Sequence, residues 1–179
     1  DHAQAKADLA EAAAIHDRLA PESLARAATL DVLAFSLPTT SGMVQTLEQA
    51  LTLKETLAPE SLAVAETLCR LTDYTYDVQR RLERAQRAQQ IRHRLAAGTM
   101  AEAASLSNLA DALRRIGDSR AAEEHERQAL AIRERRRPGS LEAAESLKSL
   151  STILVHRGDF VGAERAILRA IEICEKAAP

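Results

Sequence analysis

Apolar and polar positions follow one another along this chain with the period of amphipathic helices. In the stretch 103–116 the apolar side chains fall at i, i+3, i+4 and i+7, which places them on one helix face: Leu106, Leu109, Ala110 and Leu113. Gly117 can adopt the left-handed backbone that ends a helix. Asp118 can cap a second helix by accepting backbone N–H bonds, and Pro138 excludes its continuation. The stretch 103–138 therefore predicts two helices joined by a tight turn.

Altered copies of this helix pair account for the rest of the chain. A proline or, once, an alanine closes each second helix at successive intervals of 38, 38, 41 and 41 residues, and we call these residues the repeat marks: Pro21, Pro59, Ala97, Pro138 and Pro179. An alanine stands nine residues before every mark, and a branched aliphatic residue stands six residues before it. Agreeing columns at a regular period predict a repeat architecture. We expect a partial repeat at 1–20 and repeats at about 21–58, 59–96, 97–137 and 138–179.

The same pattern predicts about nine helices. Besides the pair within 103–138, helices are expected at 3–19, 23–35, 43–57, 61–74, 77–95, 141–155 and 160–176. The segment Ser36–Gly42 contains a proline and a glycine and predicts a breaker loop, the most irregular of the connections. Thr99 and Glu102 form the T-x-x-E pattern of a capping box, which predicts the start of the third pair. Gly158 and Asp159 repeat the Gly-Asp turn in the fourth pair.

Composition agrees with a helical chain that buries its core between neighbouring repeats. Hydrophobic residues make up 46% of the 179 residues and aromatic residues only 2%, which favours helices over a β-sandwich. The net charge of −2 implies no polyelectrolyte partner for the chain as a whole. Cys69 and Cys174 lie far apart in the repeat order, which indicates free thiols in a reducing compartment, here the cytoplasm.

The sequence contains no run of about 18 apolar residues and no signal-peptide pattern, so we expect no membrane partner. The chain starts with Asp1 and stops just after a helix, which suggests a piece of a longer protein. Ile167, Ile171 and Ile173 would then face a following repeat. Left uncovered, they predict end-to-end self-association, and a native neighbour that covers them is the other explanation.

The repeat unit resembles a tetratricopeptide repeat (TPR), of the longer kind found in kinesin light chains and in bacterial multi-repeat proteins. The third and fourth units match that family's pattern at Leu109, Ala110, Gly117, Ala122, Ala129 and Pro138, and at Leu150, Gly158, Ala163, Ala170 and Pro179. The resemblance implies an all-α fold: a right-handed superhelical solenoid of antiparallel helix pairs, forming one array over residues 1–179. Armadillo or HEAT repeats have a similar period and are the alternative fold, but the paired Gly-Asp turns favour the TPR.

The resemblance also implies a protein-interaction scaffold. First helices of the family line a concave groove, which holds a peptide or a partner domain, including another domain of the same chain. Helical spacing places polar side chains on this groove side, where we expect a partner to bind: Arg70, Asp73, Asn108, Asp111, Arg115 and Thr152. Asp31 and Lys148 flank these positions, and we expect Lys148 to bind the partner as well. In kinesin-light-chain-like repeats, asparagines in these rows hold a peptide backbone, and Asn108 stands in such a row.

No constellation typical of an enzyme occurs in the sequence. The five histidines are scattered without an H-x-x-x-H pair, and neither cysteine belongs to a CxxC motif. No glycine-rich loop is present that could cradle a phosphate. We therefore expect this chain not to be an enzyme and to hold no metal or cofactor. In bacteria such arrays often sit beside a catalytic or signalling domain, so a regulatory or sensor module is an alternative.

Arginines concentrate on two of the expected second helices: Arg80, Arg81, Arg84, Arg87, Arg92 and Arg94 on one, and Arg133, Arg135, Arg136 and Arg137 on the other. Such a stripe would attract nucleic acid or another acidic partner. No aromatic residue interleaves it for base stacking, and the resemblance places second helices on the outer, convex side. A solvated outer face is therefore the favoured interpretation, and binding of nucleic acid or an acidic partner is the alternative.

Overall fold

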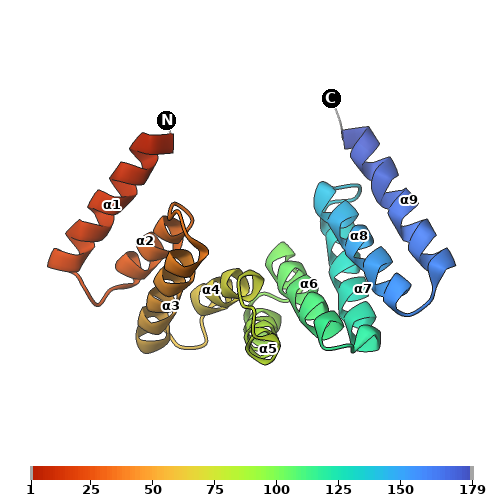
Figure 1. Ribbon diagram of the computed structural model, residues 1–179, viewed down its shortest axis with the longest axis horizontal. Helices are drawn as coiled ribbons and strands as arrows, with labels where there is room; N and C mark the ends of the chain where they lie inside the picture. Colours follow the sequence, from red (N-terminus) through yellow and green to blue (C-terminus); the bar gives the residue numbers. More distant parts are fainter. Residues whose placement is uncertain (1, 178–179) are drawn as a thin grey trace. The chain divides into compact units, whose positions relative to one another are not determined.

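The structure, a computed structural model, describes residues 2–177 as helices joined by short loops (Figure 1). Within these residues there are nine helices, α1 to α9, and no strand. The packing divides the chain into two compact units, the N-terminal unit (Asp1–Tyr76) and the C-terminal unit (Asp77–Pro179). The all-α class predicted from the sequence is confirmed.

The N-terminal unit contains α1 (His2–Leu19), α2 (Leu24–Ala34), α3 (Thr40–Leu57) and α4 (Leu62–Asp73). Each helix packs against the next one along the chain. A hydroxyl side chain caps the start of α2, α3 and α4 by accepting a backbone N–H bond: Ser23, Thr39 and Ser61. The core between the helices is made mainly of alanine and leucine, with fully buried examples at Ala27, Ala50, Leu47 and Leu71.

The C-terminal unit contains α5 (Val78–Leu95), α6 (Met100–Arg115), α7 (Ser119–Arg136), α8 (Leu141–His156) and α9 (Phe160–Ala177). Here too each helix packs against the next, and α6 also touches α8. These two are the first helices of successive predicted repeats. Their contact brings the polar side chains of two repeats into one neighbourhood.

The helix bounds agree with the predicted ranges to within three residues. The boundary between the units falls in the connection between α4 and α5, inside the repeat predicted at 59–96. The single array over 1–179 and its repeat boundaries therefore stay predictions.

Both Gly-Asp turns have the predicted form. Gly117 has a φ of 89° and Gly158 a φ of 79°, values in the left-handed region that only glycine adopts without strain. Asp118 then caps α7 by accepting the Ala121 N–H at 3.0 Å. Asp159 caps α9 in the same way by accepting the Gly162 N–H at 2.8 Å. Each turn reverses the chain within three residues and sets the two helices of the pair side by side.

Two local expectations need correction. The breaker loop predicted at Ser36–Gly42 is shorter, because α3 already begins at Thr40 and Thr39 caps it by accepting the Gly42 N–H at 3.1 Å. The capping box at α6 is shifted by one residue. Thr99 accepts the Glu102 N–H at 3.3 Å, but the Glu102 carboxylate accepts the N–H of Gly98, not that of Thr99.

Cys69 is buried and Cys174 is exposed, and neither forms a disulfide among the described residues, as predicted. None of the helices that the structure describes combines the length and the apolar character needed to cross a bilayer. At the last helix, Ile167 and Ile173 pack partly against the core shared by α7, α8 and α9, whereas Ile171 is 46% exposed. Self-association through this end stays a prediction.

Candidate functional site

The predicted binding residues fall in both units. Arg70 and Asp73 lie on α4 of the N-terminal unit, where Asp73 is exposed at the end of the helix. The other five lie on α6 and α8 of the C-terminal unit: Asn108, Asp111, Arg115, Lys148 and Thr152. There are therefore two candidate surfaces, one in each unit.

In the C-terminal unit, α6, α7 and α8 form a polar pocket of about 120 Å³. It brings together three of the predicted residues, Asp111, Lys148 and Thr152. Asn108 is half-buried and Arg115 exposed, and neither lines the pocket. The remaining lining residues are almost all polar as well, so the pocket suits a hydrogen-bonding group better than an apolar one: Ser107, Arg114, Glu126, Ser149 and Ile153.

Asp111 holds a cluster of arginines at one wall of this pocket. Its carboxylate accepts hydrogen bonds from Arg114 at 2.6 Å and from Arg115 at 2.7 Å, and Arg81 of α5 donates to it at 3.3 Å. Burial acts to raise the pKa of Asp111, but the hydrogen bonds from Arg115 and Arg114 outweigh it and hold the pKa below its ordinary value. Asp111 is thus ionised and occupied by cations of its own unit. The wall as a whole carries a net positive charge.

Glu126 of α7 lines the same pocket and is fully buried, at 0% exposure. Its Oε1 atom accepts a hydrogen bond from Ser107 Oγ at 3.0 Å, and Arg133 Nη1 lies 3.9 Å from the same oxygen. Its Oε2 atom has no hydrogen-bond partner among the described residues. Burial is the largest cause that raises the pKa of Glu126, and the charge of Asp111 adds to it. The opposing effects of Ser146, Ser107 and Arg133 do not cancel the rise.

Reasoning from the sequence missed Glu126, although the repeat pattern contains a signal for it. Glu126 stands twelve residues before its repeat mark, where the other complete repeats have Leu47, Ala85 and Ile167. Leu47 and Ala85 are fully buried core residues. A carboxyl group in a column that is otherwise apolar is costly to bury. The departure from the repeat pattern is therefore the signal that distinguishes Glu126 from its equivalents.

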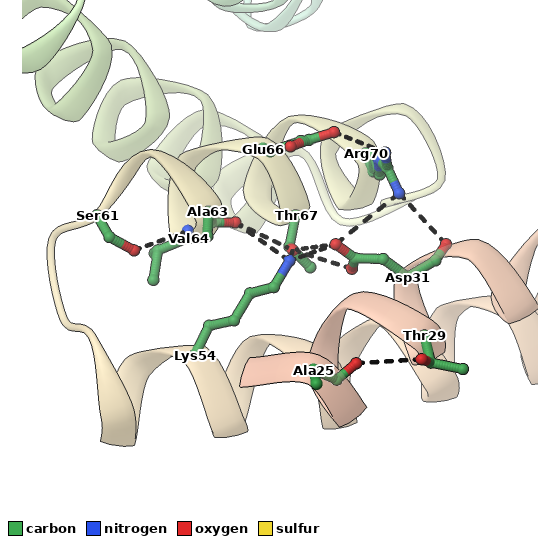
Figure 2. Close-up of polar contacts among 10 residues, drawn as sticks. All are labelled: Ala25, Thr29, Asp31, Lys54, Ser61, Ala63, Val64, Glu66, Thr67 and Arg70. Carbon is green, nitrogen blue, oxygen red and sulfur yellow. Dashed lines mark hydrogen bonds and ion pairs between the residues drawn. The ribbon is translucent and has the colours of Figure 1, made fainter. Parts of the chain in front are cut away.

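In the N-terminal unit a buried polar cluster lies beside Arg70 (Figure 2). Asp31 of α2, Lys54 of α3 and Thr67 of α4 are 5%, 4% and 0% exposed. Lys54 Nζ pairs with Asp31 Oδ2 and donates to Thr67 Oγ1 at 2.8 Å. Thr67 Oγ1 in turn lies 3.0 Å from Asp31 Oδ1. Both carboxylate oxygens of Asp31 have a partner, and the cluster joins three helices.

Arg70 covers this cluster and uses much of its own hydrogen-bonding capacity within the unit. It donates to the main-chain oxygen of Asp31 at 3.3 Å and pairs with Glu66 at 2.6 Å (Figure 2). Its guanidinium carbon lies 5.4 Å from the centre of the Phe35 ring, a cation–π arrangement. A groove of about 410 Å³, lined in part by Val32 and Arg70, runs along this face. Arg70 thus lies on a surface that a partner could contact. Its contacts with Asp31, Glu66 and Phe35 fix the position of its side chain.

A polar connection between successive repeats recurs in both units. The basic side chain five residues before a mark contacts the hydroxyl eight residues after it in three pairs: His16 with Thr29 at 3.1 Å, Lys54 with Thr67 at 2.8 Å, and Arg133 with Ser146 at 2.5 Å. At the equivalent place Arg92 donates to the Ala101 carbonyl at 2.8 Å. The interpretation of the arginines as a solvated face is therefore wrong for Arg81, Arg92 and Arg133, each 8% exposed. These side chains cross to a neighbouring helix.

Comparison with known proteins places this geometry in a family context. A tetratricopeptide-repeat model matches residues 103–136, and no curated protein sequence matches the chain. Among solved structures, the chain is similar to BtubC (BKLC) from P. vanneervenii, with 21% sequence identity and a TM-score of 0.85 over 99% of this chain and 74% of that one. It is also similar to the nearly identical TPR-like repeats of a P. anserina protein assigned as a kinesin light chain, with 22% identity and a TM-score of 0.76 over 98% and 88% of the two chains.

A third similar structure is a Rap protein complexed with Competence and Sporulation Factor, with 20% identity and a TM-score of 0.73 over 85% of this chain and 43% of that one. At such identities the likeness is one of fold. The stretch 103–136 is thus a tetratricopeptide repeat, and the chain has the helical-solenoid fold of TPR proteins. The resemblance inferred from the sequence is confirmed.

Proposed function

We propose that the chain is a protein-interaction scaffold and that the polar pocket of α6, α7 and α8 anchors an extended segment of a partner protein. The observation that supports this most directly is the pocket itself. Asp111, Lys148 and Thr152, all expected from the sequence to bind a partner, come from two different helices and line the same small cavity. Side chains from successive repeats that converge in this way give a ligand several contacts at once.

The chemistry of the pocket suits a peptide. Lys148 is exposed and offers three N–H donors, while Thr152 and Ser149 offer hydroxyls that donate and accept. Asn108 follows Ser107 on α6 and lies outside the pocket lining. Its amide group carries a donor and an acceptor together, which matches the two needs of a peptide backbone. The similar Rap protein was determined in complex with Competence and Sporulation Factor, which is in keeping with a binding role for this chain.

Arg70 and Asp73 form a second contact surface within the proposal. They lie on α4 of the N-terminal unit, next to a groove with the exposed apolar residues Leu24 and Val32 in its lining. A partner that occupies only the C-terminal pocket would not need them. The proposal therefore includes a longer partner or another domain of the same protein as the ligand.

The arginine-rich helices do not support nucleic-acid binding as the main function. Several of their side chains are engaged within the C-terminal unit, including Arg92, Arg133 and Arg136, the last of which donates to the Gly98 carbonyl at 2.7 Å. The proposal assigns no catalytic role to this chain. It places the chain in the reducing cytoplasm, in keeping with the absence of a disulfide between Cys69 and Cys174.

Selection of binding peptides from a random display library on the whole chain tests the proposal. For a selected peptide, Lys148→Ala and Asn108→Ala should each weaken binding roughly 5- to 100-fold, the equivalent of about 1–3 kcal/mol per lost hydrogen bond. Arg84→Ala and Arg135→Ala, on the second helices, are the matched controls and should change affinity little. If the control substitutions abolish binding while Lys148→Ala and Asn108→Ala leave it intact, the basic helices are the site and the proposal is wrong.

A further inference from the structure

The pocket of the C-terminal unit contains a hydrogen-bonding group that the fold leaves unused. Glu126 is fully buried, and yet its Oε2 atom has no partner among the described residues. A buried polar atom without a partner costs about 1–3 kcal/mol. Nearly all buried polar atoms in proteins are paired, so an orphan atom on a residue that lines a cavity points to a missing partner.

The hydrogen-bond pattern assigns different roles to the two oxygens of Glu126. Oε1 accepts a hydrogen bond from Ser107 Oγ at 3.0 Å and lies 3.9 Å from Arg133 Nη1. Oε1 therefore acts as a hydrogen-bond acceptor. When the acid is protonated, the proton is therefore placed on Oε2. Burial raises the pKa of Glu126, which favours this protonated form. Oε2 is then a hydroxyl donor, and the group it lacks is an acceptor.

The charged groups around the pocket indicate which acceptor is preferred. Arg114 and Lys148 line it, and the single ionised acid of the wall, Asp111, is bound by arginines. Arg133 stands behind Glu126 on α7. A positively charged ligand would be repelled by this set, and an anionic oxygen attracted.

We infer that the pocket takes an acidic side chain of the partner segment, and that protonated Glu126 donates a hydrogen bond from Oε2 to its carboxylate. This inference rests on the proposed function and names the chemistry of its central contact. Arg114 and Lys148 supply the charge that an acidic group needs, and the hydroxyls of Ser149 and Thr152 complete the lining. At about 120 Å³ the cavity has the volume of roughly four water molecules, enough for a carboxylate and its methylene group.

The inference has a consequence for pH that an ordinary ion pair does not share. An aspartate side chain has a pKa of about 3.9 and stays ionised at any pH near neutrality. As the pH rises through the elevated pKa of Glu126, the donor is lost and two carboxylates face each other. Binding should therefore weaken as the pH rises. Ordinary lysine and arginine side chains titrate above about pH 10, so a site built from such bases alone predicts no such loss.

Two pools of short peptides with random flanks, one with aspartate and one with asparagine at the centre, are the probes for this site. Binding of each pool to the whole chain is measured by titration at about pH 5.5 and about pH 8, on either side of neutrality and above the pKa of an ordinary carboxyl group. Two variants separate the roles of Glu126. Glu126→Gln keeps the shape and a donor but cannot lose a proton. Glu126→Leu puts the residue of the equivalent position, Leu47, into the pocket.

The expected result is that the aspartate pool binds the natural chain more tightly at the lower pH, by at most the roughly 10- to 100-fold of a charge-assisted hydrogen bond. Glu126→Gln should bind that pool with no such pH dependence, and Glu126→Leu should lose the preference for aspartate. Equal binding of both pools, unchanged in the two variants, would overturn the inference and leave the proposed function standing. So would a preference for aspartate that grows with pH. If neither pool binds any form of the chain, the proposed function fails together with the inference.

Discussion

Each unit buries a carboxylic acid between three successive helices, and the two acids differ in how many of their oxygens have hydrogen-bond partners. In the N-terminal unit, Asp31 of α2 meets Lys54 of α3 and Thr67 of α4, and each of its oxygens has a partner (Figure 2). In the C-terminal unit the acid is Glu126 of α7, and one of its oxygens has none among the described residues.

Repeat positions explain the difference. Lys54 and Arg133 stand five residues before their marks, and Thr67 and Ser146 stand eight residues after them, so base and hydroxyl are kept in both units. The acid, in contrast, stands at a different repeat position in each unit. Ser107 takes the place of Asp31 on the first helix, and Glu126 takes the place of Leu47 on the second. From its new position the acid lies 3.9 Å from its base, and its second oxygen has no partner among the described residues. Similar polar residues thus form a closed cluster in one unit and an incomplete cluster in the other.

The largest effect is expected from Asp31→Leu. The change leaves the Lys54 ammonium buried without its counter-ion, which should destabilise the N-terminal unit by about 3–5 kcal/mol. Urea unfolding followed by circular dichroism measures this loss. Adding Lys54→Met to the same chain should recover most of the stability, because the pair is then replaced by apolar side chains. A single substitution that costs less than about 1 kcal/mol would show that the cluster is not what holds α2, α3 and α4 together.

The matched substitution Glu126→Leu should have the opposite sign. It removes an unsatisfied buried oxygen and restores the residue type of the equivalent position, so we expect the C-terminal unit to gain about 1 kcal/mol of stability. The same unfolding experiment reports it. A loss of about 2 kcal/mol or more would mean that Glu126 is a structural partner as Asp31 is, and would remove the contrast between the units.

A smaller effect should appear in the pH dependence of stability. Because the pKa of Glu126 is raised in the folded chain, the stability linked to its proton is present below the pKa of the unfolded chain and is lost as the pH rises through the folded-state pKa. Relative to Glu126→Gln, the natural chain should therefore become less stable between acid and neutral pH. Parallel curves for the two chains over this interval would show that Glu126 does not titrate differently in the fold.

The smallest effect on stability is expected for Lys148→Ala. Lys148 is exposed at the pocket, unlike the buried Lys54, so its removal should change the free energy of unfolding by no more than about 0.5 kcal/mol. The same substitution should weaken binding of a selected peptide. This separation of binding from stability distinguishes a pocket side chain from a member of a closed cluster, and a loss of stability comparable to that of Asp31→Leu would contradict it.

The fold could be predicted from the sequence because each helix pair contains the sequence features that start, pack and end its own helices. The apolar stripe of Leu106, Leu109 and Leu113, the glycine at Gly117 and the cap at Asp118 are local features with local physical causes. The start of α3 was less predictable. Gly42 weakens a helix but does not prevent one when a cap such as Thr39 precedes it.

The candidate site could be predicted only in part. Helical spacing identified Asp111 and Thr152, with Lys148 beside them, because side chains on one face of a first helix follow from periodicity alone. Glu126 was not predicted as a site residue, because it lies on a second helix at a position where the periodicity predicts a buried core residue. Arg133 and Arg92 escaped for a related reason: a long side chain can leave a helix that looks solvent-exposed and be buried against the next one. Comparing the repeats column by column would have singled out these positions.

The most direct test of the account is the titration of the Glu126 carboxyl carbon by NMR in the whole chain labelled with ¹³C at its glutamates. The signal is assigned by its loss in Glu126→Gln. Glu172, whose pKa is lowered by the hydrogen bond from Lys176, is an internal reference on α9. The account predicts a midpoint for Glu126 above the ordinary range of glutamate and a midpoint for Glu172 below it. A Glu126 midpoint at or below that of Glu172 would mean that the acid is ionised and satisfied in the fold, and the pocket would then have no donor to offer a ligand.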